Sequence, residues 1–185
     1  MTSQRFPIWP ILLLVVVGAL LRVLRHTGDL PLPPNVAPVT AIAFLAAAYL
    51  PLRWGWAAPI GLMLASDMAI GGYTPAVMVS VYLSFGLSYL LGTTLRRSRS
   101  IGRLLSITVA GSLGFYAITN TAVWLFSGMY QLNGSGLIAS LVAGLPFLRN
   151  TLLGDLGYTA LFFSLSAVMI AGWRRMITVR THAHG

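Results

Sequence analysis

The sequence contains no cysteine, no lysine and no glutamate, and each absence narrows what the protein can be. Without cysteine there are no disulfides, no thiolate metal sites and no cysteine nucleophile. All 12 basic residues are arginine, and the 3 acids are Asp29, Asp67 and Asp155. Charged residues make up 8% of the chain, whereas a soluble domain usually carries about 25%. These values exclude an ordinary soluble domain.

Motifs for catalysis are also missing. The sequence has no phosphate-binding glycine loop, no His-Glu-x-x-His and no Gly-x-Ser-x-Gly. General acid–base work would fall to Asp67, Asp155 or His26. We therefore expect a transport protein rather than an enzyme. Without an ATPase motif, primary transport would need a partner protein.

The chain is instead rich in long hydrophobic segments. Hydrophobic residues are 57% of its 185 residues, and the mean hydropathy is +0.82. A span needs about 20 apolar residues, so residues 1–185 predict a single all-α integral membrane domain with six transmembrane helices. The formal charge of +9 is expected at helix ends, as topology requires, and not in a nucleic-acid site. The predicted spans are 7–24, 36–50, 56–70, 75–95, 104–126 and 146–173.

Other apolar segments are short. Spans 36–50 and 56–70 are expected to be tilted or to flank a cavity. Residues 136–145 are apolar but too few to cross a bilayer, so we expect a separate re-entrant or interfacial helix there. A polar loop is expected at 127–135, before this helix.

The distribution of arginine predicts the orientation. With the N-terminus inside, the outer side holds Arg22, Arg25 and Arg149. The inner side then holds Arg5, Arg53, Arg96, Arg97, Arg99, Arg103, Arg174, Arg175 and Arg180. Both termini are therefore expected in the cytoplasm, with the protein in the bacterial inner membrane. The expected outer loops, 25–35, 71–75 and 127–149, carry the unusual polar residues, among them His26 and Tyr73.

Asp67 is a carboxylate inside an apolar run, near the outer end of span 56–70. An ionisable group in a membrane segment is energetically costly and is by default a functional-site hypothesis. The alternative is that Asp67 pairs with an arginine and only fixes helix packing. The sequence leaves both interpretations open.

Further polar residues lie in the outer halves of the spans. Asn120 and Trp124 are one helical turn apart and share a face. Tyr82 lies about two turns into span 75–95, and Asn150 and Asp155 begin the last span. Together they predict an outward cavity for a neutral or zwitterionic organic ligand. The alternative is an aromatic belt with interhelical hydrogen bonds.

Two single residues also leave alternatives. Arg149, with Asp155 or Asp67, predicts either a site for a phosphate or carboxylate or an ion pair between helix ends. His26 is either a ligand-binding residue or a polar surface residue.

Several stretches together resemble the substrate-binding S-components of energy-coupling factor (ECF) vitamin transporters, and most of all the solitary cobalamin transporters of proteobacteria. The resemblance covers residues 8–172. It implies a six-helix bundle with an outward vitamin pocket and uptake by toppling of the protein in the bilayer. The stretches are Pro34-Asn-Val-Ala-Pro-Val-Thr-Ala-Ile-Ala-Phe44, Leu64-Ala-Ser-Asp67, Gly72-Tyr73, Val81-Tyr-Leu-Ser-Phe85, Thr119-Asn-Thr-Ala-Val-Trp124 and Pro146-Phe-Leu-Arg-Asn-Thr-Leu-Leu-Gly-Asp155.

What the resemblance implies for the site is specific. Cobalamin is the expected bound substrate, with Asp67 and Tyr82 matching a carboxylate and an aromatic residue of those transporters. Those transporters use a cysteine as a ligand to cobalt, and this chain has none; Ser80 lies in the region where it would be expected. If cobalamin is the ligand, His26 or Ser80 would lie near the cobalt. The first helix lacks the Ala-x-x-x-Ala pattern that serves a shared ECF module, which favours a solitary mode. The alternatives are a module-dependent S-component for another vitamin or a corrinoid-modifying membrane enzyme.

Overall fold

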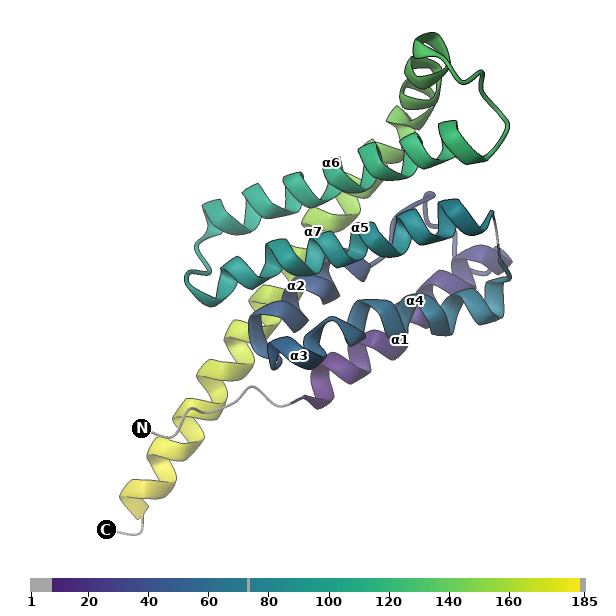
Figure 1. Ribbon diagram of the computed structural model, residues 1–185. Helices are drawn as coiled ribbons and strands as arrows, with labels where there is room; N and C mark the ends of the chain where they lie inside the picture. The colour runs from purple at the N-terminus through teal and green to yellow at the C-terminus, as the bar shows by residue number, and fades with distance from the viewer. Residues whose placement is uncertain (1–7, 73, 184–185) are drawn as a thin grey trace.

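The computed structural model describes residues 8–72 and 74–183, with side chains as far as Gly172, and the regular elements in this part of the chain are all helices (Figure 1). All the predicted spans except the last match its helices within a few residues. Between two of the predicted spans, residues 52–55 form a single helical turn, α3. The elements are α1 (Trp9–Thr27), α2 (Val39–Tyr49), α3 (Leu52–Gly55), α4 (Ala57–Ile70), α5 (Pro75–Thr93), the 3₁₀ turn η1 (Thr94–Arg96), α6 (Ile101–Phe126) and α7 (Gly134–Ala183).

Local sequence signals set the helix ends. Gly28 ends α1 in the left-handed conformation, with φ of 86°, and its N–H donates to the carbonyl of Arg25. Gly71 ends α4 with φ of 91°, a conformation that side chains rarely allow. Pro75 then begins α5, where the missing N–H costs nothing. At the start of α6 the Ser100 hydroxyl accepts a hydrogen bond from the Arg103 amide.

The centre of the bundle is α2, which is apolar on every side and buried from Val39 to Ala48. Such a helix belongs in the interior. Small residues let its neighbours approach closely: a Cβ on Gly92 of α5 would lie 2.9 Å from the Cα atom of Phe44. This close contact is typical of helix packing in membranes, where small residues occupy the interfaces.

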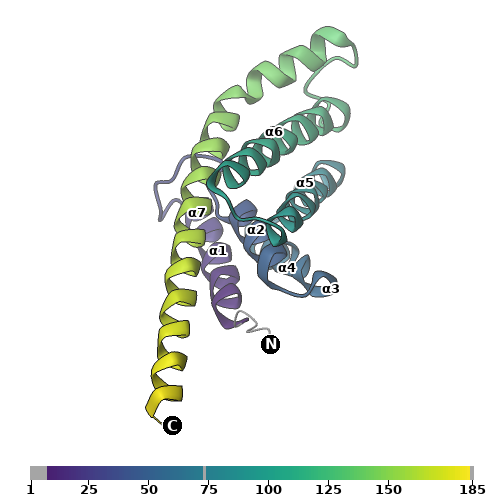
Figure 2. The ribbon, with the colours of Figure 1, turned by 90° about the vertical axis from the view of Figure 1, so that its left-hand side faces the viewer.

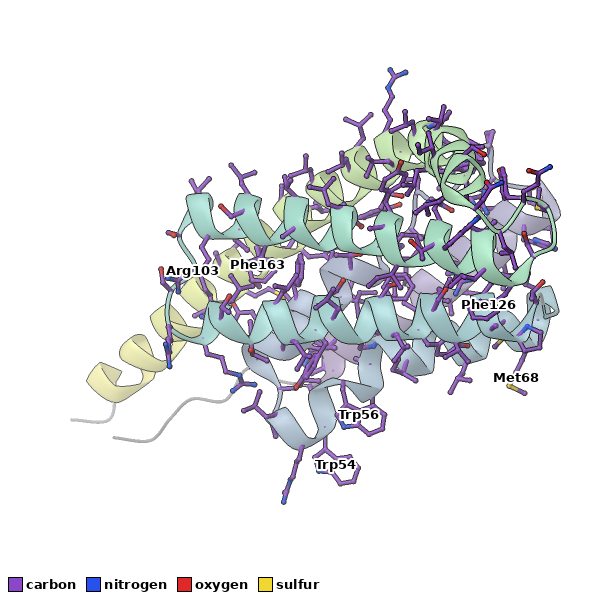
Figure 3. All side chains as sticks on the ribbon, turned by 45° about the horizontal axis from the view of Figure 1, so that its top comes forward. Trp54, Trp56, Met68, Arg103, Phe126 and Phe163 are labelled. Carbon is purple, nitrogen blue, oxygen red and sulfur yellow. The ribbon has the colours of Figure 1, made fainter. Side chains whose placement is uncertain are left out.

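The outside of the bundle is apolar as well. Large hydrophobic side chains are exposed along α1, α5, α6 and α7, and these helices are long and apolar enough to cross a membrane. Figure 3 shows Trp54, Trp56 and Met68 projecting away from the bundle, with exposed fractions of 61%, 50% and 87%. An exterior of this kind suits lipid and not water. The protein is therefore an all-α membrane protein with four candidate spans in its described part.

The predicted spans 36–50 and 56–70 form shorter helices. α2 has 11 residues and α4 has 14, and at 1.5 Å per residue neither reaches the roughly 30 Å of a bilayer core. They pack against α1, α5 and each other. Six full crossings therefore remain a prediction.

The chain reverses at each end of the bundle (Figure 1). The start of α1, the turn α3, the connection from α5 to α6 and the end of α7 lie at one end. The segments 28–38 and 127–133, the end of α4 and the start of α5 lie at the other. This arrangement agrees with the predicted grouping of loops. We call the first the arginine-rich end, because α3 and the connection from α5 to the start of α6 carry the described residues Arg53, Arg96, Arg97, Arg99 and Arg103.

The prediction of a separate short helix at 136–145 is wrong. α7 runs without a break from Gly134 to Ala183, with Pro146 inside it. Figure 2 shows the first part of α7 bending over the end of α6 before the helix continues past α2. A proline inside a helix removes one hydrogen bond and bends the helix instead of ending it when neighbouring helices support it. Asn150 and Asp155 therefore lie well inside α7 and not at its start.

Candidate functional site

A cavity of about 630 Å³, called the polar cavity below, lies between α1, α2, α4, α5, α6 and α7, with the 28–38 segment and the 127–133 segment at its edge. Its size falls within the roughly 300–1,000 Å³ of typical ligand pockets. Residues from six helices and loops contribute to its wall. Because these residues are far apart in sequence, the cavity exists only in the folded bundle.

The mouth of this cavity carries positive charge. Arg25 and His26 lie in the last turn of α1 and line the cavity. His26 is exposed and Arg25 is half-buried. In the described part of the chain no carboxylate pairs with Arg25. Asn35, which has a positive φ of 64°, adds an amide from the 28–38 segment. The mouth can therefore hold an anionic group of a ligand.

The floor of the cavity is formed by Asp155, which is 3% exposed. Its Oδ2 accepts a hydrogen bond of 2.7 Å from the Ser112 hydroxyl, and Thr40 of α2 is a second hydrogen-bonding neighbour. Salt bridges of the described residues do not include Asp155. A carboxylate held only by hydroxyls keeps acceptor capacity for a ligand N–H or a cation.

Asp67 is bonded quite differently. Arg22 Nη2 donates to its Oδ1 over 2.9 Å, and the Tyr82 hydroxyl donates to its Oδ2 over 2.8 Å. A second nitrogen of Arg22 donates to Ser66 Oγ over 2.8 Å, and Ser66 also bonds back to its own helix. Asp67 and Tyr82 do not line the cavity, but Arg22 does. This cluster supports the cavity wall from behind.

The wall between α6 and α7 is tightly packed. Asn120 lines the cavity and lies so close to Gly144 that a Cβ there would be 2.4 Å from its Oδ1. Besides the bond from Ser112 to Asp155, the Ser140 hydroxyl donates to the Asn120 carbonyl at 2.9 Å and the Tyr116 hydroxyl donates to the Leu141 carbonyl at 2.6 Å. The bend of α7 and these bonds together place Asn120 beside the cavity.

The structure brings His26, Asn120 and Asp155 of the predicted site residues to one cavity and leaves others outside it. Ser80 donates to the Val77 carbonyl of its own helix. Trp124 donates to the Gln131 carbonyl and ties down the 127–133 segment. Arg149 is exposed and Asn150 half-buried, and neither lines the cavity. Tyr73 lies outside the described residues.

An ion pair of Arg149 with Asp67 or Asp155 was one of the predicted alternatives, and it is wrong. Asp67 pairs with Arg22 instead, and Arg149 forms no salt bridge with any described residue. Arg22 lies inside an apolar segment of α1. A cation in that position needs an acid, and this signal in the sequence identifies it as a candidate partner of Asp67.

The sequence alone did not predict that Thr40 and Arg25 line the cavity. Thr40 looks like an ordinary member of an apolar helix, and Arg25 fits the general pattern of arginine at span ends. Only the packing of α2 at the centre of the bundle turns the Thr40 side chain towards Asp155.

Comparison with known proteins places the chain without assigning an activity. Residues 2–178 match the model of a family of unknown function, DUF6580, and the chain belongs to this family. No curated protein and no solved structure matches it.

Proposed function

We propose that this DUF6580 member captures a vitamin-sized organic molecule from the outer side of the bacterial inner membrane and carries it inward. The observation that supports the proposal best is the polar cavity, with Arg25 at its mouth and Asp155 at its floor, neither of which forms a salt bridge with a described residue. A ligand with an acidic group at one end and N–H donors at the other would match both. Such molecules are amphoteric.

Each part of the cavity has a defined task in this proposal. Arg25 binds a carboxylate or phosphate of the ligand through two parallel hydrogen bonds. Asp155 accepts N–H groups at the floor. Between them Phe85 and Phe115, whose ring centroids are 5.3 Å apart, offer an apolar surface to a flat ring system. A small number of well-placed polar groups is enough to fix the orientation of a ligand in such a cavity.

The cavity volume bears on which vitamin is carried. A cavity of about 630 Å³ lies in the range of pockets that hold drug-sized ligands, and a corrinoid with its nucleotide loop is larger than that class. We therefore propose a vitamin smaller than cobalamin as the main substrate. Cobalamin is the first compound to compare, because the resemblance of several sequence stretches to cobalamin transporters implies it.

The first experiment asks what the purified protein retains. Protein extracted in mild detergent is denatured, and released small molecules are identified by mass spectrometry and by absorption. We expect a stoichiometric amphoteric compound that an Arg25→Gln variant retains poorly. Arg149→Gln, which removes an exposed arginine outside the cavity, is the matched control. An empty wild-type protein that binds none of a vitamin panel in calorimetry contradicts the proposal.

The second experiment tests uptake and the solitary mode. A strain that depends on an external vitamin and lacks its own importer is complemented with this gene, with and without an ECF energising module. Growth at low vitamin concentration without the module supports solitary uptake. Growth only with the module assigns the protein to the module-dependent S-components, and no growth in either case argues against uptake.

A further inference from the structure

A second cavity, of about 720 Å³, lies at the arginine-rich end between α6 and α7, with Tyr49 of α2 at its edge. Its wall is almost wholly apolar, from Ile101 and Leu105 of α6 to Ala167 and Ile170 of α7. Figure 3 shows Phe163, which lines it, lying near the same end of the bundle as Arg103. We call this cavity the α6–α7 groove.

One cation lies at the rim of the groove. The Arg99 guanidinium stacks over the ring of Tyr49, 4.2 Å from the ring centroid. The Tyr49 hydroxyl is in turn held by Ser166 of α7 at 3.1 Å. Arg99 Nη2 also donates to the Ala48 carbonyl over 3.4 Å. The other N–H groups at the edge of a guanidinium stacked by its face stay available for an anion. Arg99 is therefore held in place without being neutralised.

No acid of this chain is placed to neutralise Arg99. Asp67 is paired with Arg22, and Asp155 lines the polar cavity and not the groove. Asp29 follows α1, at the opposite end of the bundle.

A polar group inside the groove is also without a partner. Thr159 is 3% exposed and lines the groove, and its hydroxyl is the buried side-chain atom of the described residues that has no hydrogen bond. A hydroxyl of a helix in a membrane ordinarily bonds to its own backbone, as Thr151 does. A buried hydroxyl left unpaired favours a bound molecule with an acceptor group.

We propose that the α6–α7 groove is a binding site for an anionic phospholipid of the membrane. Its acyl chain lies along the apolar wall, an ester oxygen accepts from Thr159, and the phosphate bonds to Arg99. Basic pockets between helices are known to hold anionic headgroups in this way. Loss of one arginine contact of about 1 kcal/mol corresponds to roughly a fivefold loss of affinity.

The test measures lipid retained by the full protein. The protein is reconstituted in nanodiscs of phosphatidylcholine with one-fifth phosphatidylglycerol, extracted, and analysed by native mass spectrometry. We expect retained phosphatidylglycerol in excess of its share, lowered about fivefold by Arg99→Gln. Arg97→Gln, in the same loop but outside the groove, should leave it unchanged. Ala167→Phe, which fills the groove, should remove retained lipid of both kinds.

Three results would overturn the site. The first is that the protein retains the two lipids in proportion to their supply. The second is that Arg97→Gln and Arg99→Gln change the retained phosphatidylglycerol equally. The third is that the protein is a dimer without bound lipid and that Ala167→Phe dissociates this dimer. Thermal melting of each variant in detergent shows whether it is folded. Because the ligand of the polar cavity plays no part in this assay, its outcome is independent of the proposed uptake function.

Discussion

The two carboxylates inside the bundle have opposite surroundings. Asp67, on α4, accepts hydrogen bonds from an arginine and a tyrosine and stands behind the wall of the polar cavity. Asp155, on α7, accepts from a serine hydroxyl, forms no salt bridge with a described residue and faces the cavity directly. Both are buried, at 6% and 3% exposed. Burial alone therefore does not tell a structural acid from a binding acid.

The difference between them is one of unused bonding capacity. An acid that is neutralised by an arginine within the bundle has its interactions satisfied before a ligand arrives. An acid held by hydroxyls keeps lone pairs that a ligand can use. We infer that Asp67 contributes mainly to stability and that Asp155 contributes mainly to binding. Each prediction below tests that division.

Asp67→Asn should have the largest effect on stability. The change leaves the Arg22 guanidinium, whose side chain is 17% exposed, without its counter-charge. Breaking a buried pair from one side costs about 3–5 kcal/mol, which corresponds to a fall in melting temperature on the order of 10 °C for a chain of this size. Thermal melting in detergent measures it.

A double variant serves as the control for this prediction. Arg22→Met with Asp67→Leu removes both charges at once, and replacing a buried pair by apolar residues is often neutral. We expect the double variant to regain most of the lost stability. If Asp67→Asn instead melts like the wild type but loses ligand, Asp67 is the binding acid and the division fails.

Asp155→Asn should act on binding and not on stability. Asparagine keeps an oxygen for the Ser112 hydroxyl and removes a charge that no described arginine compensates. A hydrogen bond to a charged group contributes about 1.5–3 kcal/mol, so retention of the cavity ligand should fall roughly tenfold to a hundredfold. Calorimetry or mass spectrometry of retained ligand measures this, with melting as the control. A variant that melts more than a few degrees lower and binds normally would reverse the assignment.

Much of the fold could be predicted from the sequence, because its signals are local. Apolar length and arginine at span ends indicated a helical membrane protein, and Gly71 with Pro75 marked a turn that the structure contains. The separate helix at 136–145 and the start of a new span at Pro146 were wrong. A proline cannot by itself show whether a helix ends or bends, since that depends on which neighbours support the helix.

The site was less predictable because its pairings are long-range. Asp67 finds Arg22, 45 residues earlier, and Asp155 finds Ser112, 43 residues earlier. The small number of acids singled out Asp67 and Asp155 as candidate site residues, but it did not show which arginine would neutralise one of them. His26, Asn120 and Asp155 were placed together correctly, because all three were assigned to one end of the bundle. The isolation of Asp155 from arginine follows only from the packing of α2 against α7.

Gly144→Ala tests whether the tight α6–α7 wall is needed on the Asp155 side. The new Cβ would lie 2.4 Å from Asn120 Oδ1, so Asn120 or the helix must move. Overpacking of this kind costs about 1–3 kcal/mol, and ligand retention should fall with stability because Asn120 lines the cavity. Gly157→Ala on the same helix meets no atom within 4 Å and is the matched control. Equal melting temperatures for the two variants would show that the wall is loose.

The smallest effects come from removing one hydroxyl beside each carboxylate. Tyr82→Phe takes a donor from Asp67, and Ser112→Ala takes one from Asp155. Hydrogen bonds between membrane helices average about 0.6 kcal/mol, so either variant should melt only about 1–2 °C lower. The two variants should differ in ligand binding. Ser112→Ala removes the donor that orients the floor carboxylate, so ligand retention should fall about threefold. Tyr82→Phe should leave ligand retention unchanged, because Arg22 still holds Asp67 in place. A threefold loss in Tyr82→Phe with none in Ser112→Ala would mean that the ligand senses the Asp67 cluster, and the two acids would then have to exchange roles.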